Sequence, residues 1–267
     1  MQFGCCTSIK HYCAVKEAGY GYMEISGDEL TKISQEEFTG FLELYSEWRF
    51  PCYAINDFAS APLALVGDGW NENSWKRYMK KLLQRASALD VKMIAIGAPA
   101  CRQLPESYPR NRANQQFVSF LHMAGALAES YDIQILIEPL HEGVCQYVNY
   151  VEDAVELAEE VNRCNVAVVL DFFHAWKMHE AIEKLEKAMP YVKHLHISSI
   201  TPEGTRCYLN KTNLECLEDV YRFVVQSNYQ GNMSIEIPAE AFDAKKAKIN
   251  LELFKEMQSP IYRSPNL

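Results

Sequence analysis

Several features that mark particular classes of protein are missing from this sequence. It has no run of about 18 or more apolar residues, so a membrane-spanning helix is not expected. Its opening segment, MQFGCCTSIK, is too short and too polar for a secretory signal peptide. The nine cysteines are odd in number and include no CxxC pair, which is typical of reduced thiols rather than of a disulfide framework. We therefore expect a cytoplasmic protein with no membrane partner.

Basic residues are in the minority. Lys and Arg total 26 against 35 Asp and Glu, which gives a net charge of −9. Proteins that bind a phosphate backbone usually carry the opposite balance, so nucleic acid is not an expected partner. The remaining composition, 48% hydrophobic and 23% charged over 267 residues, is ordinary for a globular protein and excludes disorder as the main state.

The sequence does contain a regular alternation of short apolar runs and longer amphipathic stretches. The runs are almost continuously apolar, as expected of parallel strands covered on both faces. They predict strands at 3–8, 20–26, 52–58, 91–98, 133–140, 166–173, 192–200 and 233–239, and helices at 10–18, 35–48, 74–88, 113–130, 151–163, 177–188, 213–227 and 243–257. This α/β alternation indicates a (β/α)8 TIM barrel, one domain over residues 1–267. A doubly wound sheet is the alternative, but no GxGxxG fingerprint follows the first strand.

Each of the last four predicted strands carries one side chain that could bind a metal near its C-terminal end, where barrel enzymes place their catalytic groups. These side chains are Glu138, Asp171, His196 and Glu236. Neighbouring strands lie less than about 5 Å apart, so the four can converge. Three carboxylates there would repel and desolvate one another without a cation. An oxygen-rich set with one imidazole predicts one divalent metal ion, Mn²⁺ first, with Mg²⁺, Co²⁺ or Zn²⁺ as alternatives.

Two further histidines lie near these positions. In the strand at 192–200 we expect His196, nearer the C-terminal end, to face the barrel lumen. His194 is then expected to face the helix layer as a packed core histidine. His174 follows its strand directly and is a candidate for a hydrogen bond to a substrate oxygen, although a capping or loop role is equally compatible with its position.

Three charged residues complete the candidate substrate contacts. Arg102 and Arg206 lie in loops after predicted strands, where a guanidinium contacts an anionic or hydroxyl-rich ligand or is simply solvated. Glu24 stands near the end of the second strand. It belongs to the same set, orients a metal ligand, or pairs with a basic residue.

The barrel pattern and the four ligands resemble the xylose isomerase-like sugar phosphate isomerase/epimerase superfamily over essentially the whole chain. IEPLHEGVCQYVNYVEDAVEL is similar to its fifth strand and following loop, VVLDFFH to its sixth strand, and IGAPACRQLP to the stretch after strand four in one branch. The resemblance implies a metal-dependent enzyme of carbohydrate metabolism that isomerises or epimerises a small keto-sugar or sugar phosphate. It also implies that Glu138 and Glu236 remove and return the proton.

One segment departs from that pattern. Ketose 3-epimerases tend to have Glu-Pro-Leu-Asn-Arg-x-Glu after strand five, whereas this chain has His141, Glu142 and Val144 in place of the Asn, the Arg and the second Glu. His141 is therefore a further candidate substrate contact. The alternative function is a metal-dependent dehydratase of a keto-cyclitol or similar β-hydroxy ketone, with His141 or His174 protonating the leaving group. A barrel that only senses a sugar is a third interpretation.

The expected partner is in each case a small-molecule carbohydrate. A homo-oligomer is compatible with the sequence, which does not fix the number of subunits.

Overall fold

The computed structural model describes residues 1–210 and 214–257 and shows a closed barrel of parallel strands in the order β1-β10-β7-β6-β5-β4-β3-β2. The strands are β1 (Phe3–Cys6), β2 (Tyr22–Ser26), β3 (Cys52–Asn56), β4 (Met93–Ile96), β5 (Gln134–Ile137), β6 (Val166–Asp171), β7 (Val192–Ile197) and β10 (Asn232–Glu236). Because β1 pairs with both β2 and β10, the ring has no free edge. The predicted single-domain (β/α)8 barrel is confirmed.

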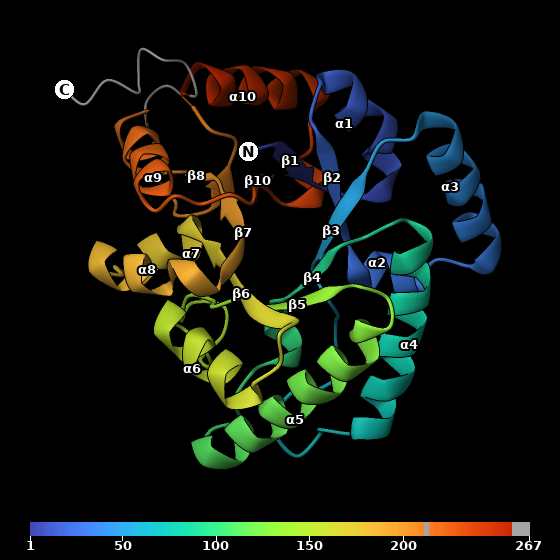
Figure 1. Ribbon diagram of the computed structural model, residues 1–267, viewed down its shortest axis with the longest axis vertical. Coiled ribbons are helices and arrows are strands. Elements are labelled where there is room, and N and C mark those ends of the chain that lie inside the picture. Colours follow the sequence, from blue (N-terminus) through green and yellow to red (C-terminus); the bar gives the residue numbers. More distant parts are fainter. Residues whose placement is uncertain (211–213, 258–267) are drawn as a thin grey trace.

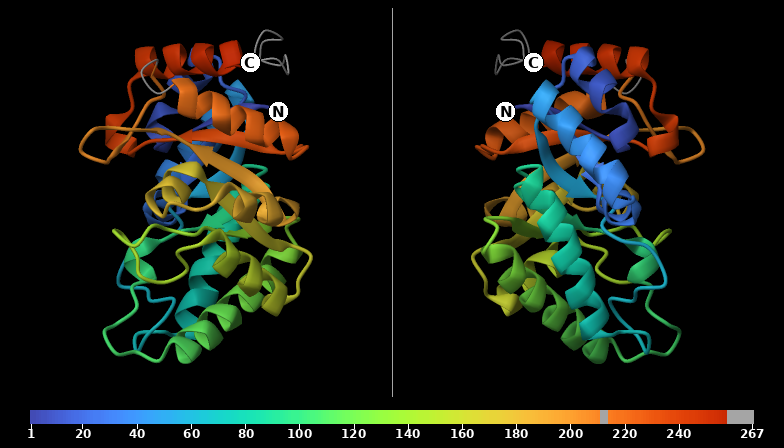
Figure 2. Two further views of the ribbon diagram at one scale, coloured as in Figure 1. Left: turned by 90° about the vertical axis from the view of Figure 1, so that its left-hand side faces the viewer. Right: turned by 90° about the vertical axis from the view of Figure 1, so that its right-hand side faces the viewer.

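Helices form an outer ring around these strands, as Figure 1 shows. The helices that alternate with the barrel strands are α1 (Tyr12–Ala18), α3 (Gln35–Trp48), α4 (Glu72–Ala88), α5 (Arg110–Glu129), α6 (Val151–Val161), α8 (Ile182–Ala188), α9 (Leu214–Gln226) and α10 (Ala244–Met257). The first and the last of them, α1 and α10, lie side by side and close the helix layer (Figures 1 and 2). The predicted start of the helix at 213–227 lies outside the described residues.

Helix α6 illustrates how the sequence builds this layer. Its N-terminus is capped by Asp153, whose carboxylate accepts the backbone N–H groups of Asn149 and Tyr150 at 3.0 and 3.1 Å. Its apolar residues recur at helical spacing, and the resulting stripe is buried against the barrel: Val151, Ala154, Leu157, Ala158 and Val161.

The structure adds short elements that the sequence did not predict. Helix α2 (Gly27–Lys32) follows β2 directly, and α7 (Phe172–Lys177) follows β6 directly. Residues 172 and 173 were predicted as strand but are helical, because the Asp171 carboxylate accepts the Phe173 N–H at 2.8 Å and starts α7 there. The predicted strand at 192–200 is divided in the structure into β7 and β8 (Ser199–Ile200). Strand β8 pairs with β9 (Arg206–Cys207) in a two-stranded antiparallel sheet.

Two packed regions hold the barrel together. A large core lies between strands and helices, and a smaller cluster fills the lumen with mostly small side chains: Ala54, Met93, Ala95, Leu136, Ala167 and Val169. The small lumen residues leave room above them for polar side chains at the C-terminal ends of the strands. The cysteines that the structure describes are free thiols, as predicted. None of the described helices has the length and apolar character needed to cross a membrane.

Candidate metal centre and active-site cavity

The four predicted ligands meet at the C-terminal end of the barrel. Each of Glu138, Asp171, His196 and Glu236 offers one donor atom, and these atoms all lie within 4.8 Å of one another. Asp171 and Glu236 are the last residues of β6 and β10, Glu138 comes directly after β5, and Asp171 is paired in register with His196. The barrel therefore brings together side chains that are 98 positions apart in sequence at their furthest, from residue 138 to residue 236.

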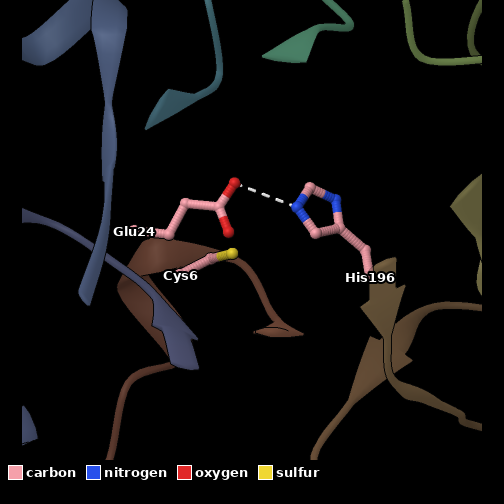
Figure 3. A group of neighbouring side chains, drawn as sticks. All are labelled: Cys6, Glu24 and His196. Atoms are coloured by element: carbon pink, nitrogen blue, oxygen red, sulfur yellow. Dashed lines mark hydrogen bonds and ion pairs between the residues drawn. The ribbon is translucent and has the colours of Figure 1, made fainter. Parts of the chain in front are cut away.

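A hydrogen bond to a buried carboxylate fixes the orientation of the His196 ring. Its Nε2 donates to Oε1 of the fully buried Glu24 at 2.9 Å, as Figure 3 shows. Its Nδ1 consequently faces the other ligands, 3.0 Å from Oε2 of Glu236 and 3.7 Å from Oε1 of Glu138. Nδ1 of His196 and Oε2 of Glu236 are both buried, yet neither has a hydrogen-bond partner. Two buried electron-donor atoms that face each other without a hydrogen bond are the arrangement that a bound cation would satisfy.

His194 lies beside His196 in the lumen, and the prediction that it faces the helix layer is wrong. Its Nε2 is 3.0 Å from Oε2 of Glu24 and 3.2 Å from Oγ of Ser234. Residues two apart on a strand point to the same face, so His194 must share the face of His196. The prediction that it is a packed, hydrogen-bonded core histidine is correct. One carboxylate, that of Glu24, thus binds both imidazoles of β7.

The charges at this centre are strongly coupled. Burial raises the pKa of Glu138, and the neighbouring carboxylates of Glu236 and Asp171 add to that effect. Burial would also raise the pKa of Asp171, but the Arg206 guanidinium outweighs it and holds that pKa well below its usual range. Arg206 donates a hydrogen bond to Oδ2 of Asp171 and lies 3.4 Å from Oε2 of Glu236. Glu138 is therefore the most basic of the ligand carboxylates that show a shift.

The donor set fits a divalent cation. The centre holds four carboxylates, Glu24 included, so even a protonated His196 together with Arg206 leaves two negative charges unbalanced. Three carboxylates and one imidazole suit Mn²⁺, Mg²⁺ or Co²⁺ better than they suit Zn²⁺. Cys6 is the third member of a neighbouring group with Glu24 and His196 (Figure 3). Burial and the Glu24 carboxylate raise the pKa of the Cys6 thiol well above its usual range, so it stays protonated.

A cavity of about 590 Å³ opens above the centre. On one side it is lined by His141, His174 and Arg206, three of the predicted substrate contacts. The guanidinium of Arg206 stacks on the ring of Phe173, with 4.2 Å between its central carbon and the ring centroid. The opposite side consists of polar residues at the ends of β1, β2 and β3: Thr7, Ser26, Asn56 and Asp57.

A family model described as xylose isomerase-like TIM barrel matches residues 13–257. The chain belongs to this family. An inosose isomerase from Halalkalibacterium halodurans is 24% identical over 238 residues, which cover 85% of this chain and 80% of that protein.

Solved structures show the same architecture as this xylose isomerase-like barrel. A D-allulose 3-epimerase from Methylomonas sp., in complex with D-allulose, has a TM-score of 0.81 at 18% identity and covers 96% of this chain and 97% of its own. The IOLI protein with a bound zinc atom has a TM-score of 0.71 at 21% identity and covers 98% of both chains. At these identities the two structures establish the fold.

Two predicted substrate contacts lie outside the cavity of this xylose isomerase-like barrel. Arg102 is completely buried, and its guanidinium donates to the carbonyl oxygens of Ile96 at 3.2 Å and Glu138 at 2.8 Å. These two hydrogen bonds hold the ends of β4 and β5 together beside the candidate metal centre. Glu24 lies beneath the centre and orients His196, which is one of the three alternatives that the sequence left open.

Sequence reasoning missed the polar wall and one glycine. Asn56 and Asp57 end a strand just as the ligands do, and this position was the available signal. Burial raises the pKa of Asp57, whose carboxylate accepts a hydrogen bond from Ser26 at 2.7 Å. Gly97 lies against the metal centre, because a Cβ at that position would come within 2.2 Å of Oε2 of Glu138. Only a glycine leaves space there for the carboxylate.

Proposed function

We propose that this protein is a divalent-metal-dependent isomerase or epimerase of an uncharged polyhydroxy ketone, such as a keto-sugar or keto-cyclitol. The observation that carries the proposal is the convergence of Glu138, Asp171, His196 and Glu236 beneath an open cavity. The relation to an inosose isomerase and the likeness to an epimerase structure with D-allulose support it. Those substrates are ketones or cyclic ketones rich in hydroxyl groups.

The chain's own residues account for the proton transfer. A divalent ion bound at the centre would supply positive charge that favours enolisation of a ketone. Glu138, whose pKa is raised by burial, is the better placed base to take a proton from the carbon next to the carbonyl. Glu236, whose side chain is 20% exposed, returns a proton. Two carboxylates acting on opposite faces of the carbon give epimerisation, and a single carboxylate acting on one face gives aldose–ketose isomerisation.

The charge of the cavity favours an uncharged substrate over a sugar phosphate. With Glu138 and Glu236 assigned to the metal, the described lining residues still place the carboxylates of Asp57 and Glu240 against one guanidinium, that of Arg206. Arg206 is already paired with Asp171 and Glu236. A phosphate would thus meet mainly negative charge, which is unfavourable at short range. Hydroxyl groups, in contrast, can donate to the carboxylates of Asp57 and Glu240.

The test is solvent exchange. The Mn²⁺-loaded protein is incubated in D₂O with a panel of ketohexoses and inososes and with the phosphate esters of the same ketoses. Mass spectrometry, after removal of the metal, then follows deuterium at the carbon next to the carbonyl. We expect exchange with at least one uncharged ketone, little with its phosphate ester, and no exchange with a Glu138→Gln variant. Loss of water instead of exchange would indicate the dehydratase, and neither reaction across the panel would overturn the proposal.

A further inference from the structure

Three side chains next to the metal centre form a continuous hydrogen-bonded chain. Arg206 Nη2 lies 3.0 Å from Nε2 of His174, and Nδ1 of His174 lies 2.7 Å from Nδ1 of His141. The two imidazole rings stack with centroids 4.9 Å apart. Both histidines line the cavity. His174 is buried, whereas His141 is partly exposed. The chain therefore runs from the partly buried guanidinium of Arg206 to the ring of His141 at the cavity surface.

The protonation of these rings follows from the guanidinium donor, Arg206. A guanidinium has donors and no acceptor, so Nε2 of His174 must present a lone pair to Arg206. The single proton of a neutral His174 is then on Nδ1, where it is donated to Nδ1 of His141. That bond requires a lone pair on Nδ1 of His141, which leaves the proton of a neutral His141 on Nε2.

One contact favours the opposite arrangement. The backbone N–H of His141 also points at Nδ1 of His174, at 3.1 Å, and would be satisfied if that nitrogen carried no proton. A neutral imidazole cannot accept at both nitrogens, so the backbone donor and the guanidinium compete. Hydrogen bonds from an ionised donor are about twice as strong as those between neutral groups, and Arg206 is therefore the stronger of the two.

We infer that Arg206 fixes the tautomers of both histidines, so that His141 presents its Nε2–H to the substrate as a neutral hydrogen-bond donor. Burial and the positive charges of Lys177 and Arg206 lower the pKa of His141, which agrees with a neutral ring. Gly143 lies close to this nitrogen, since a Cβ there would be only 3.1 Å from Nε2 of His141. The ring edge is held against Phe173 at 5.5 Å between centroids.

This inference deepens the proposed function by naming the group that meets an oxygen of the ketone. A neutral donor can stabilise negative charge that develops on that oxygen without giving up its proton. His141 occupies the position where ketose 3-epimerases tend to carry Asn, so this chain has an imidazole where those enzymes have an amide. On this interpretation, His141 distinguishes the chemistry of this chain from that of those relatives.

The tautomers can be observed directly, whether or not the enzyme has a known substrate. The chain has seven histidines, and two-bond nitrogen–proton correlation NMR of the ¹⁵N-histidine-labelled, Mg²⁺-loaded protein distinguishes the two neutral tautomers of each. Signals are assigned by their loss in His141→Gln and His174→Asn variants. We expect His174 protonated on Nδ1 and His141 on Nε2. His141 protonated on Nδ1, or on both nitrogens, would overturn the inference.

Activity provides a second test once an exchanging ketone is found. His141→Phe keeps a ring and removes the donor, and it should lower kcat/KM by about 10²-fold, the usual cost of removing one such donor. His141→Gln keeps an N–H at similar reach and should retain at least about tenfold more activity than the Phe variant. His122→Gln, on the exposed side of α5, is the matched control and should equal wild type.

The two tests separate the proposals. Equal losses in the Phe and Gln variants, or no loss in either, would contradict a donor role for His141. If no ketone exchanges with the wild type, the proposed function fails, while the NMR pattern still decides whether Arg206 sets the tautomers.

Discussion

Glu24 and His196 are joined by a 2.9 Å hydrogen bond between Oε1 and Nε2, although 172 positions separate them in the sequence. Burial would raise the pKa of Glu24, but His196 and His194 hold it well below its usual range, so the carboxylate stays ionised. An ionised acceptor on Nε2 keeps Nδ1 of His196 free for a metal and increases its basicity.

We expect Glu24→Gln to weaken Mn²⁺ binding by about 10- to 100-fold, the range found for partners of metal-binding histidines. The amide cannot accept from both imidazoles of β7 as the carboxylate does. Equilibrium dialysis measures the effect. Glu240→Gln, an exposed carboxylate at the cavity, controls for the loss of one negative charge and should bind Mn²⁺ nearly as well as wild type. Equal affinities for all three proteins would rule out the orienting role.

The purified protein should bind one divalent ion per chain at Glu138, Asp171, His196 and Glu236. His196→Ala removes the only nitrogen of this set and should reduce the affinity by at least about 10²-fold, because an incomplete set of ligands binds metals poorly. Elemental analysis after incubation with Mn²⁺ and gel filtration gives the stoichiometry. His122→Ala serves as the control, and a metal-free wild type after this treatment would contradict the prediction.

Glu138→Gln and Glu236→Gln should each lower turnover by at least about 10²-fold, the typical contribution of general acid–base catalysis. Metal binding should fall less, because amide oxygens still coordinate hard cations. Steady-state kinetics and metal content are measured on the same preparations. Substitution of the carboxylate that removes the proton should abolish solvent exchange. Substitution of the other carboxylate should leave solvent exchange intact but prevent product formation. Near-normal turnover with full metal content would exclude these carboxylates as bases.

Gly97→Ala should damage the centre without unfolding the barrel. The new Cβ would lie 2.2 Å from Oε2 of Glu138, so this carboxylate must move. We expect Mn²⁺ affinity to fall by at least about tenfold, as for other changes that displace a metal ligand. Gly40→Ala on α3 is the matched control, because no atom lies within 4 Å of its added Cβ. It should stabilise the fold by up to about 1 kcal/mol and leave metal binding unchanged.

The partly buried carboxyl of Glu180 should make the free energy of unfolding depend on pH. Burial raises the pKa of its carboxyl to about 7 from an ordinary value of 4.5, while the Val151 N–H at 3.0 Å partly opposes the shift. A pKa raised by folding means that the folded state binds the proton more tightly. The stabilisation is therefore complete below pH 4.5 and is lost as the pH rises through 7.

Glu180→Gln keeps the acceptor for the Val151 N–H and removes the charge. The variant should be more stable than wild type at pH 8, by about 1 kcal/mol after allowance for solvent screening, and this advantage should shrink toward pH 5. Urea unfolding at both pH values measures the difference. A constant difference between pH 5 and pH 8 would show that Glu180 does not titrate in this range.

The barrel and the positions of the four ligands were accessible from sequence for one physical reason. Parallel strands end at the same edge, so a polar residue at the end of each of four consecutive apolar runs must meet the others. Asp171 and His196 lie in register for this reason. The error on His194 came from misapplying the same periodicity, since residues two apart share a face.

Contacts that depend on loops could not be predicted in the same way. Nothing in the periodicity places Nδ1 of His141 against Nδ1 of His174, because this contact depends on the path of the segment after β5. Arg102 and Arg206 both looked like loop cations. The structure buries one against backbone carbonyl groups and places the other, on β9, among the carboxylates. Composition and spacing do not distinguish these two outcomes.

The four candidate metal ligands all come from the second half of the chain, between residues 138 and 236, whereas the polar wall opposite comes from residues 7 to 57. The four candidate ligands and this wall of the cavity are thus encoded in separate stretches of the gene, joined in space by the pairing of β1 with β10. Variation confined to the first sixty codons can alter the polar wall while leaving the four candidate ligands intact, with codon 24 as the exception because its carboxylate binds His194 and His196.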